Sequence, residues 1–276
     1  MRAAIVAISI AILTFFCVAQ KCGAQQIKFT PLEKSEVLHR VEKTPATDQE
    51  RAAQLKTWFD EAGCGVIDLT EQKVEGSAAP NVICRLAGKS SSTIVIGAHF
   101  DHASSSQRPL DNWSGAALLP GLYRCLRDRK RHFNFVFVAF ADNGNDVAGS
   151  KSFADHLEAE GAHNVRAMIN LDALGLSPTK IWTAHSDKEL VKALIQCVYM
   201  LKLPASQVDI TAAGNSDSDP FADRKVPQIT LHSITQEHLR KAVPLKFRPG
   251  NYYDSYRLLC GYLALLDATL KPGSRS

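Results

Sequence analysis

Two patterns of hydrophobic and polar residues alternate along most of the chain. Short uninterrupted apolar runs, typical of strands buried on both faces, are separated by longer stretches with apolar residues every three to four positions. The runs that predict strands are Gly65–Leu69, Val82–Leu86, Thr93–Ala98, Phe133–Phe140, Ala167–Leu171, Ile181–Ala184 and Val226–Leu231. The stretches that predict helices are Leu32–Val41, 47–59, Trp113–Arg127, Ser150–Ala159, Lys188–Leu201 and Tyr252–Leu270. This alternation predicts a three-layer α/β/α fold with a mixed, mostly parallel central sheet.

The N-terminal segment has the order of a secretory signal peptide. Arg2 precedes an apolar stretch, and small residues follow it up to Gly23 and Ala24. We expect cleavage after Ala24, with Ala19 as the alternative site, and a retained N-terminal anchor is the competing interpretation. The expected organisation is a signal peptide at 1–24, a polar segment at 25–46, one domain at 47–271 and a short tail at 272–276. We therefore expect a secreted or periplasmic protein that has no membrane segment once the signal peptide is removed.

Charge and cysteine content narrow the function classes. The chain has 276 residues with 32 basic and 28 acidic side chains, a near balance that argues against a nucleic-acid partner. Two of the seven cysteines fall within the expected signal peptide. The other five, none of them in a C-x-x-C pair, are Cys64, Cys84, Cys125, Cys197 and Cys260. A thiolate zinc site is therefore not indicated, and the last three cysteines, which lie in apolar helical patterns, are expected to be buried thiols.

Polar residues with metal-ligating side chains follow the predicted strands. His99 and Asp101 come directly after the run at 93–98, Asp111 begins the next predicted helix, and Asp172 follows the run at 167–171. The carboxyl ends of parallel strands gather functional groups, and histidine with carboxylates is a zinc-binding combination. Alone, Asp111 reads as a helix N-cap and Asp172 as a turn residue. Together with the His-x-Asp pattern they favour a zinc site.

Several segments resemble the motifs of the secreted zinc aminopeptidase family, whose relatives include bacterial leucyl aminopeptidase, glutamate carboxypeptidase and glutaminyl cyclase. The segments, in chain order, are Ile96-Gly97-Ala98-His99-Phe100-Asp101, Asp111-Asn112-Trp113-Ser114-Gly115-Ala116, Gly149-Ser150-Lys151, Asn170-Leu171-Asp172-Ala173-Leu174-Gly175 and Ser216-Asp217-Ser218-Asp219-Pro220-Phe221. The last is a degraded form of its motif. The resemblance extends from about residue 45 to about residue 270 and implies the zinc-exopeptidase fold.

The resemblance implies a site with two zinc ions that share a bridging aspartate. Carried over by position, His99, Asp111 and Asp172 form one complete metal half-site. Asp101 matches the carboxylate that holds the ligand histidine in orientation. We therefore expect one zinc ion, and a second is doubtful for the reasons that follow.

The other half of the implied site lacks its glutamates. An alignment without gaps places Asn143 at the general base and Gly144 at the ligand glutamate. An amide is no carboxylate base near neutral pH, and glycine has no ligand atom. Asp142 or Asp146 could substitute only if the loop shifts, and an aspartate is one methylene shorter than glutamate.

The C-terminal ligand histidine is also in doubt. His232 lies at the end of the predicted strand at 226–231, whereas the family places its histidine further into the loop. His238 is the other local histidine, and it has no nearby aspartate on its C-terminal side. We interpret both as surface or hydrogen-bonded histidines and keep them as secondary candidate ligands.

These observations favour an exported zinc-aminopeptidase-like protein that is inactive or strongly impaired as a peptidase and binds a peptide or protein partner. One alternative is an active metallo-aminopeptidase that releases N-terminal residues with a replacement base. Another is a glutaminyl-cyclase-like acyltransferase, although that branch takes its zinc through the Glu position that is missing here.

Overall fold

The computed structural model describes residues 29–101, 111–141, 146–159, 164–208, 215–240 and 246–271. Its strands are β1 Leu69–Gln72, β2 Asn81–Leu86, β3 Thr93–His99, β4 Asn134–Phe140, β5 Val165–Leu171, β6 Thr179–Ser186, β7 Ala205–Gln207 and β8 Gln228–His232. Its helices are α1 Lys34–Glu42, α2 Asp48–Glu61, α3 Asp111–Arg127, α4 Ala148–Ala159, α5 Lys188–Leu201, α6 Asp219–Asp223, α7 Gln236–Leu239 and α8 Pro249–Thr269. The expected alternation of strands and helices is therefore present.

The strands form one mixed sheet in the order β1-β2-β4-β3-β5-β8-β6-β7. The central pairs β4/β3, β3/β5 and β5/β8 are parallel, as is the outer pair β6/β7. The pairs β1/β2, β2/β4 and β8/β6 are antiparallel. Because β3 and β5 are parallel neighbours, the residues that follow them meet at one edge of the sheet.

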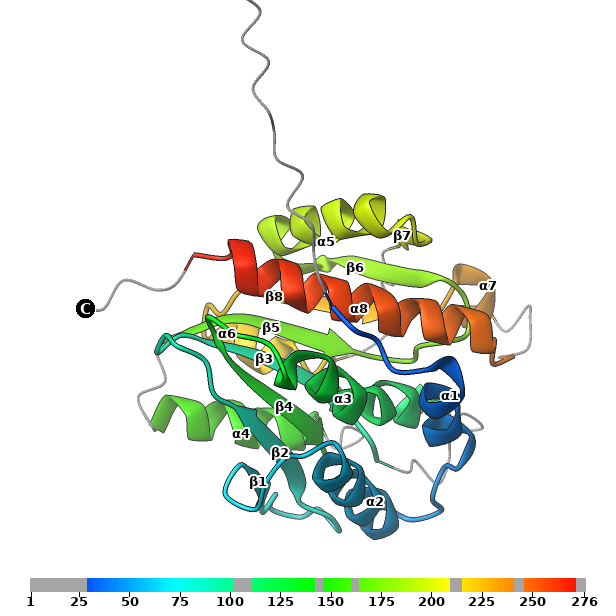
Figure 1. Ribbon diagram of the computed structural model, residues 1–276. Coiled ribbons are helices and arrows are strands. Elements are labelled where there is room, and N and C mark those ends of the chain that lie inside the picture. The colour runs from blue at the N-terminus through cyan, green and yellow to red at the C-terminus, as the bar shows by residue number, and fades with distance from the viewer. Residues whose placement is uncertain are drawn as a thin grey trace, which may run out of the picture.

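Helices cover both faces of the sheet (Figure 1). The larger core packs α1, α2, α3, α5 and α8 against one face, with α3 and α8 in front of the sheet in this view. The smaller core lies on the other face, where Phe153 of α4 and Phe221 of α6 pack against Phe140 of β4. The predicted three-layer α/β/α architecture is confirmed.

The predicted strand at Gly65–Leu69 is wrong, because Gly65 begins a turn. The Gly65 carbonyl accepts hydrogen bonds from the amides of Asp68 and Leu69, both at 2.9 Å, and β1 begins only at Leu69. Val66 and Ile67, whose apolar character suggested the strand, are each 88% exposed. A disulfide between Cys64 and Cys84 anchors the start of this turn to β2. The chain must therefore reverse before Leu69 can pair with Cys84.

The remaining cysteines of the described residues are buried thiols, as expected: Cys125, Cys197 and Cys260. Burial raises the pKa of the Cys197 thiol to about 12. Such a thiol stays protonated near neutral pH and packs as a small apolar side chain. Within the described part of the chain, no helix has the length and apolar content that a membrane crossing requires.

Candidate metal centre

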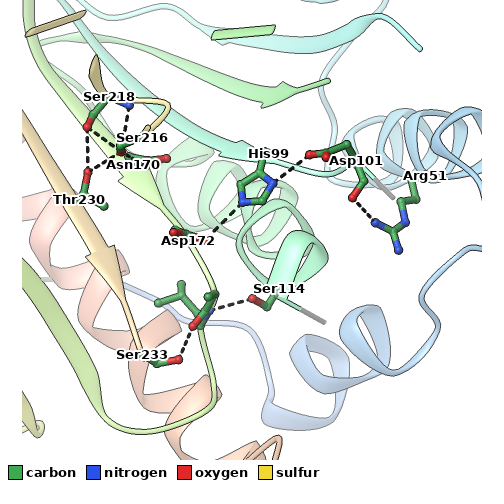
Figure 2. A network of polar contacts seen from close by, with 12 residues as sticks. Arg51, His99, Asp101, Ser114, Asn170, Asp172, Ser216, Ser218, Thr230 and Ser233 are labelled. Atoms are coloured by element: carbon green, nitrogen blue, oxygen red, sulfur yellow. Dashed lines mark hydrogen bonds and ion pairs between the residues drawn. The ribbon is translucent and has the colours of Figure 1, made fainter. Parts of the chain in front are cut away.

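The site is built where two neighbouring parallel strands end. His99 is the last residue of β3, and Asp172 directly follows β5. Their side chains point toward each other (Figure 2), with 3.3 Å between His99 Nε2 and Asp172 Oδ1. His99 is 8% exposed, and the Asp172 side chain is 33% exposed. A histidine nitrogen and a carboxylate oxygen therefore converge at a position that solvent can reach.

Asp101 fixes the orientation of the His99 ring. Its Oδ1 lies 3.0 Å from His99 Nδ1, and both side chains are buried. A carboxylate on one ring nitrogen sets the tautomer and turns the other nitrogen outward, as is typical of metal-ligating histidines. The nitrogen left for a metal is therefore Nε2, which faces Asp172 (Figure 2).

The carboxylates around His99 make the cluster favourable for positive charge. Burial opposes protonation of the ring, but hydrogen bonds to Asp101 and Asp172 and the charge of Asp217 hold the pKa of His99 well above its usual range. Burial likewise opposes ionisation of Asp172, yet the His99 side chain lowers the pKa of that carboxyl. In contrast, burial dominates at Asp217 and raises its pKa to about 6.

Arg51 of α2, which is not among the predicted site residues, holds the His99–Asp101 segment through its backbone. Its side chain is fully buried, and Nη1 donates to the carbonyl oxygens of Phe100 and Asp101, both at 2.8 Å. The guanidinium also lies 5.6 Å from the ring centroid of Trp113, in the first turn of α3. Arg51 thus links three elements, and Figure 2 shows it beside Asp101.

One feature of the sequence could have identified Arg51. It lies four residues before Leu55 and seven before Trp58, so it falls on the apolar face of α2 rather than on its solvent side. An arginine at such a position must find polar partners inside the protein.

The turn after β5 is held by residues from two other segments. Leu174 donates its amide to Ser114 Oγ of α3 at 2.8 Å. The carbonyl of Ala173 accepts from both the hydroxyl and the amide of Ser233, which follows β8. Ala173 has a φ of 44°, in the region that residues other than glycine rarely adopt. These bonds, two of them drawn in Figure 2, fix the backbone that carries Asp172.

A buried hydroxyl network lies beside Asp172 on β5, β8 and the start of α6. Asn170 Nδ2 donates to Ser216 Oγ at 3.0 Å, and Ser218 shares hydrogen bonds with Ser216 and Thr230 at 3.0 and 2.9 Å. Ser216 and Ser218 belong to the degraded Ser216–Phe221 motif, so this part of the motif links β5 to β8 beside the site (Figure 2). Ser218 forms hydrogen bonds within this network, and in the described part of the structure it forms none with His99 or Asp172.

Three of the predicted site residues lie wholly or partly outside the part of the chain that the structure describes. Asp111 is the first residue of α3, which places its backbone near the same edge of the sheet, but its side chain lies outside the described part. Asn143 and Gly144 lie outside the described residues altogether. Within the described ranges, no group of three or more His, Cys, Asp or Glu side chains forms a complete metal site.

The two secondary histidines are placed differently. His232 ends β8 and is buried, with Nδ1 accepting from the Ile234 amide at 3.1 Å. Its Nε2 has no hydrogen-bond partner in the described part of the structure. Burial lowers the pKa of His232 to about 4 despite the nearby charge of Asp172, so the ring is neutral near pH 7. His238 instead caps α7, with Nδ1 accepting from the Thr235 amide at 3.1 Å.

The residues that are described fit zinc at one position. His99 Nε2 and the Asp172 carboxylate supply two of the donor types that zinc prefers, and Asp101 holds the ring as such a ligand requires. His232 senses the charge of Asp172, which raises the pKa of the ring against the effect of burial. Among the described residues, however, it does not join His99 and Asp172 in a group of three that could hold a metal ion.

Two comparisons of the sequence with known proteins give matches. The model for peptidase family M28 matches residues 81–255. Aminopeptidase YwaD of Bacillus subtilis (strain 168) is 25% identical over 160 residues, which cover 55% of this chain and 33% of that protein. The chain thus spans about a third of the length of this curated relative.

Solved structures share the fold at low sequence identity. The Legionella pneumophila LapA aminopeptidase superimposes with a TM-score of 0.70 at 16% identity, covering 86% of this chain and 71% of that one. An Acidobacteriales bacterium glutaminyl cyclase superimposes with a TM-score of 0.68 at 17% identity, covering 91% and 99%. Since the family model covers more than half of the sequence and includes the His99–Asp101 and Asp172 segments, the chain belongs to peptidase family M28.

Proposed function

We propose that this protein is an exported, aminopeptidase-like member of family M28 that binds one zinc ion and is inactive or strongly impaired as a peptidase. Members of this family are zinc enzymes, and peptides are the substrates of a peptidase family. His99, Asp111 and Asp172 would hold the ion. Zinc bound there would supply Lewis-acid polarisation of a carbonyl group and a lowered pKa for water. The observation that carries the proposal is the convergence of His99 and Asp172 with Asp101 behind them.

The impairment is inferred from the residues that replace the two glutamates. Asn143 has no carboxylate to accept a proton, and Gly144 has no side chain to bind a second ion. General-base catalysis contributes about 10²–10⁴-fold to the rate. A chain that keeps one half-site would therefore bind zinc and peptide groups without turning peptides over at an ordinary rate.

Export is supported by two observations. The first 24 residues have the order of a signal peptide, and the Cys64–Cys84 disulfide is of a kind that persists in oxidising compartments. We propose that the mature protein is secreted or periplasmic.

Each of the two alternatives has one observation in its favour. For an active aminopeptidase, Asp146 is an exposed carboxylate next to the residues that replace the glutamates, although its Oδ1 already accepts from Asn215 at 2.6 Å. For a glutaminyl-cyclase-like acyltransferase, the match to the Acidobacteriales protein covers nearly the whole of both chains. Because the ligand Glu of that branch is missing, this second alternative is the less favoured.

The test combines metal analysis of the purified exported protein with two assays, one on aminoacyl-nitroanilides and one on a peptide with N-terminal glutamine. We expect one zinc per chain and little or no turnover of either substrate. Two zinc ions with substantial nitroanilide hydrolysis would overturn the proposal in favour of the aminopeptidase. Cyclisation of the glutamine peptide would overturn it in favour of the acyltransferase. The variant His99→Ala, expected to lose the zinc, is the control for the site.

The double variant Asn143→Glu, Gly144→Glu then tests why the peptidase activity is impaired. If the missing glutamates are its cause, the variant gains a second zinc ion and measurable hydrolysis. If it gains neither, the missing C-terminal histidine is the better explanation.

A further inference from the structure

We propose that the protein has a second site, at the amino-terminal ends of the central strands, whereas His99 lies at their carboxyl-terminal ends. This site binds a small molecule in which a carboxylate is attached to an apolar body. A pocket of about 470 Å³ lies between α4, α6 and the amino-terminal ends of β5 and β8. This volume is within the range of small-molecule sites. Strand β5 has seven residues, so about 20 Å separates this pocket from the strand's carboxyl end, where Asp172 lies.

The pairing of β5 with β3 is irregular beside this pocket. Thr93 of β3 pairs with Val165 and Ile94 pairs with Ala167, so Arg166 has no partner residue in β3. Adjacent residues of a regular strand point to opposite faces, yet Val165 and Arg166 both line the pocket. A bulge that re-aims one side chain accounts for this, and it brings the Arg166 guanidinium to the pocket beside the apolar side chains of Leu157, Phe221 and Val226.

Arg166 has no protein partner in the described part of the structure. Its Nε is buried without a hydrogen bond, and none of the hydrogen bonds or ion pairs of the described residues involves its other nitrogens. An unpartnered group of this kind is costly inside a protein. The guanidinium is therefore a free, planar donor set of the geometry that binds carboxylates in a bidentate manner.

The other charges at the pocket do not neutralise Arg166. Arg224 is held by an ion pair to Asp155 of α4 and by a hydrogen bond from Nη1 to the Pro220 carbonyl at 2.7 Å. Asp223 and Lys225 are both exposed and of opposite sign. Arg224 and Asp155 cancel each other, and Asp223 and Lys225 add one charge of each sign. The charge that remains without a counterpart is the positive charge of Arg166. The site thus favours an anion.

The walls determine what the anion is attached to. Leu157 of α4, Phe221 of α6 and Val226 before β8 line the pocket with aliphatic and aromatic surface. A second unusual backbone position shapes this wall, because Lys225 has a φ of 60° and turns the chain from α6 toward β8. An inorganic anion would leave these walls uncovered, whereas an apolar carboxylate would cover them and pair with Arg166.

The experiment measures binding of octanoate to the full exported protein by calorimetry, with 1-octanol as the uncharged probe of equal chain length. We expect saturable one-to-one binding of octanoate, and binding of octanol that is at least about tenfold weaker, since only octanoate can form a charge-assisted bidentate pair with Arg166. Arg166→Met should weaken octanoate binding by a similar factor and leave octanol unaffected. Lys192→Met, which removes an exposed cation on α5, should bind octanoate like the wild type.

Arg166→Met is expected to fold normally, because the side chain it removes makes no hydrogen bond within the described structure. Thermal unfolding checks this, and its midpoint should equal that of the wild type or exceed it. Absence of saturable octanoate binding, or equal binding by the wild type and Arg166→Met, would overturn the proposal. Loss of zinc in His99→Ala should not change octanoate binding, so this proposal and the proposed zinc function succeed or fail separately.

Discussion

At the scale of single residues, the site depends on how one imidazole is held. His99 makes two contacts through its two nitrogens, at 3.0 Å to Asp101 and 3.3 Å to Asp172. Only the Asp172 side of the ring opens toward a ligand, because Asp101 is buried. In the proposed zinc site the two aspartates would therefore have different tasks, Asp101 orienting the ring and Asp172 offering an oxygen to the metal.

Replacing Asp101 should weaken zinc binding without removing a ligand. In Asp101→Asn the amide can present a donor to Nδ1, which favours the wrong tautomer for a metal at Nε2. Changes to such orienting partners lower metal affinity about 10–100-fold. We expect a loss in this range, measured by competition with a chelating dye, while the exposed control Asp128→Asn retains full affinity. Equal affinity in Asp101→Asn and the wild type would show that the ring is held by other contacts.

Asp217 is a second residue whose environment leads to a measurable effect. Burial raises its pKa from an ordinary value near 3.8 to about 6, so the folded state binds a proton more readily than the unfolded state. The buried charge therefore costs stability above pH 6, and the cost fades as the pH falls toward 4. Two pKa units correspond to about 3 kcal/mol as an order of magnitude.

We therefore expect metal-free Asp217→Asn to be more stable than the metal-free wild type at pH 7–8. Below about pH 4 the Asp217 carboxyl is protonated in both folded and unfolded wild type, and the two proteins should have similar stability. Urea unfolding between pH 4 and pH 8 measures the difference. A difference that stays constant over this range would mean that Asp217 is neutral or well solvated throughout.

At the scale of elements, α2 supports the site without contributing a ligand to it. Arg51 reaches from α2 to the carbonyls of Phe100 and Asp101, and it packs against Trp113 of α3. Because α3 begins at Asp111, this single side chain connects two of the three segments that carry candidate ligands, those of His99 and Asp111. The Cys64–Cys84 disulfide ties the other end of α2 to β2.

Arg51→Met should lower both stability and zinc affinity. It leaves two buried carbonyl oxygens without their donor and removes a stacked cation, which together cost about 2–4 kcal/mol. Urea unfolding measures the first effect, and dye competition under conditions where the variant remains folded measures the second. Arg124→Met, which removes a half-exposed arginine with a 3.4 Å ion pair to Glu36, should change stability by less than about 1 kcal/mol. A similar small change in Arg51→Met would contradict the supporting role of α2.

The elements also show what a single sequence can and cannot predict. Long segments with a clear period were predicted correctly, and Lys188–Leu201 matches α5 at both ends. The short elements β7, α6 and α7 were missed because three to five residues define no period. The strand ends that carry His99 and Asp172 were predicted because chemistry and position coincided there. Arg51 and Arg166 were missed because their roles depend on contacts with distant segments.

At the scale of the whole molecule, the two edges of one sheet carry different chemistry. The carboxyl edge brings together His99, Asp172 and their supports, and the amino edge carries the Arg166 pocket. The β3–β5 pair runs through both, with regular pairing near the candidate metal centre and a bulge near the pocket. Both arrangements depend on α2, α3, α4 and α6 being held against this sheet.

The disulfide should contribute to global stability and leave the metal centre intact in the folded protein. Cys64 and Cys84 are separated by 20 residues, and a cross-link of this loop length stabilises by about 3 kcal/mol, chiefly by restricting the unfolded chain. The double variant Cys64→Ser, Cys84→Ser should lose about this amount in urea unfolding. A reducing agent should destabilise the wild type equally and leave the double variant unchanged. Because Arg51 still holds the His99–Asp101 segment in the folded variant, its zinc affinity at low urea should match that of the wild type. A loss of zinc affinity without urea would show instead that the disulfide positions α2 for the site.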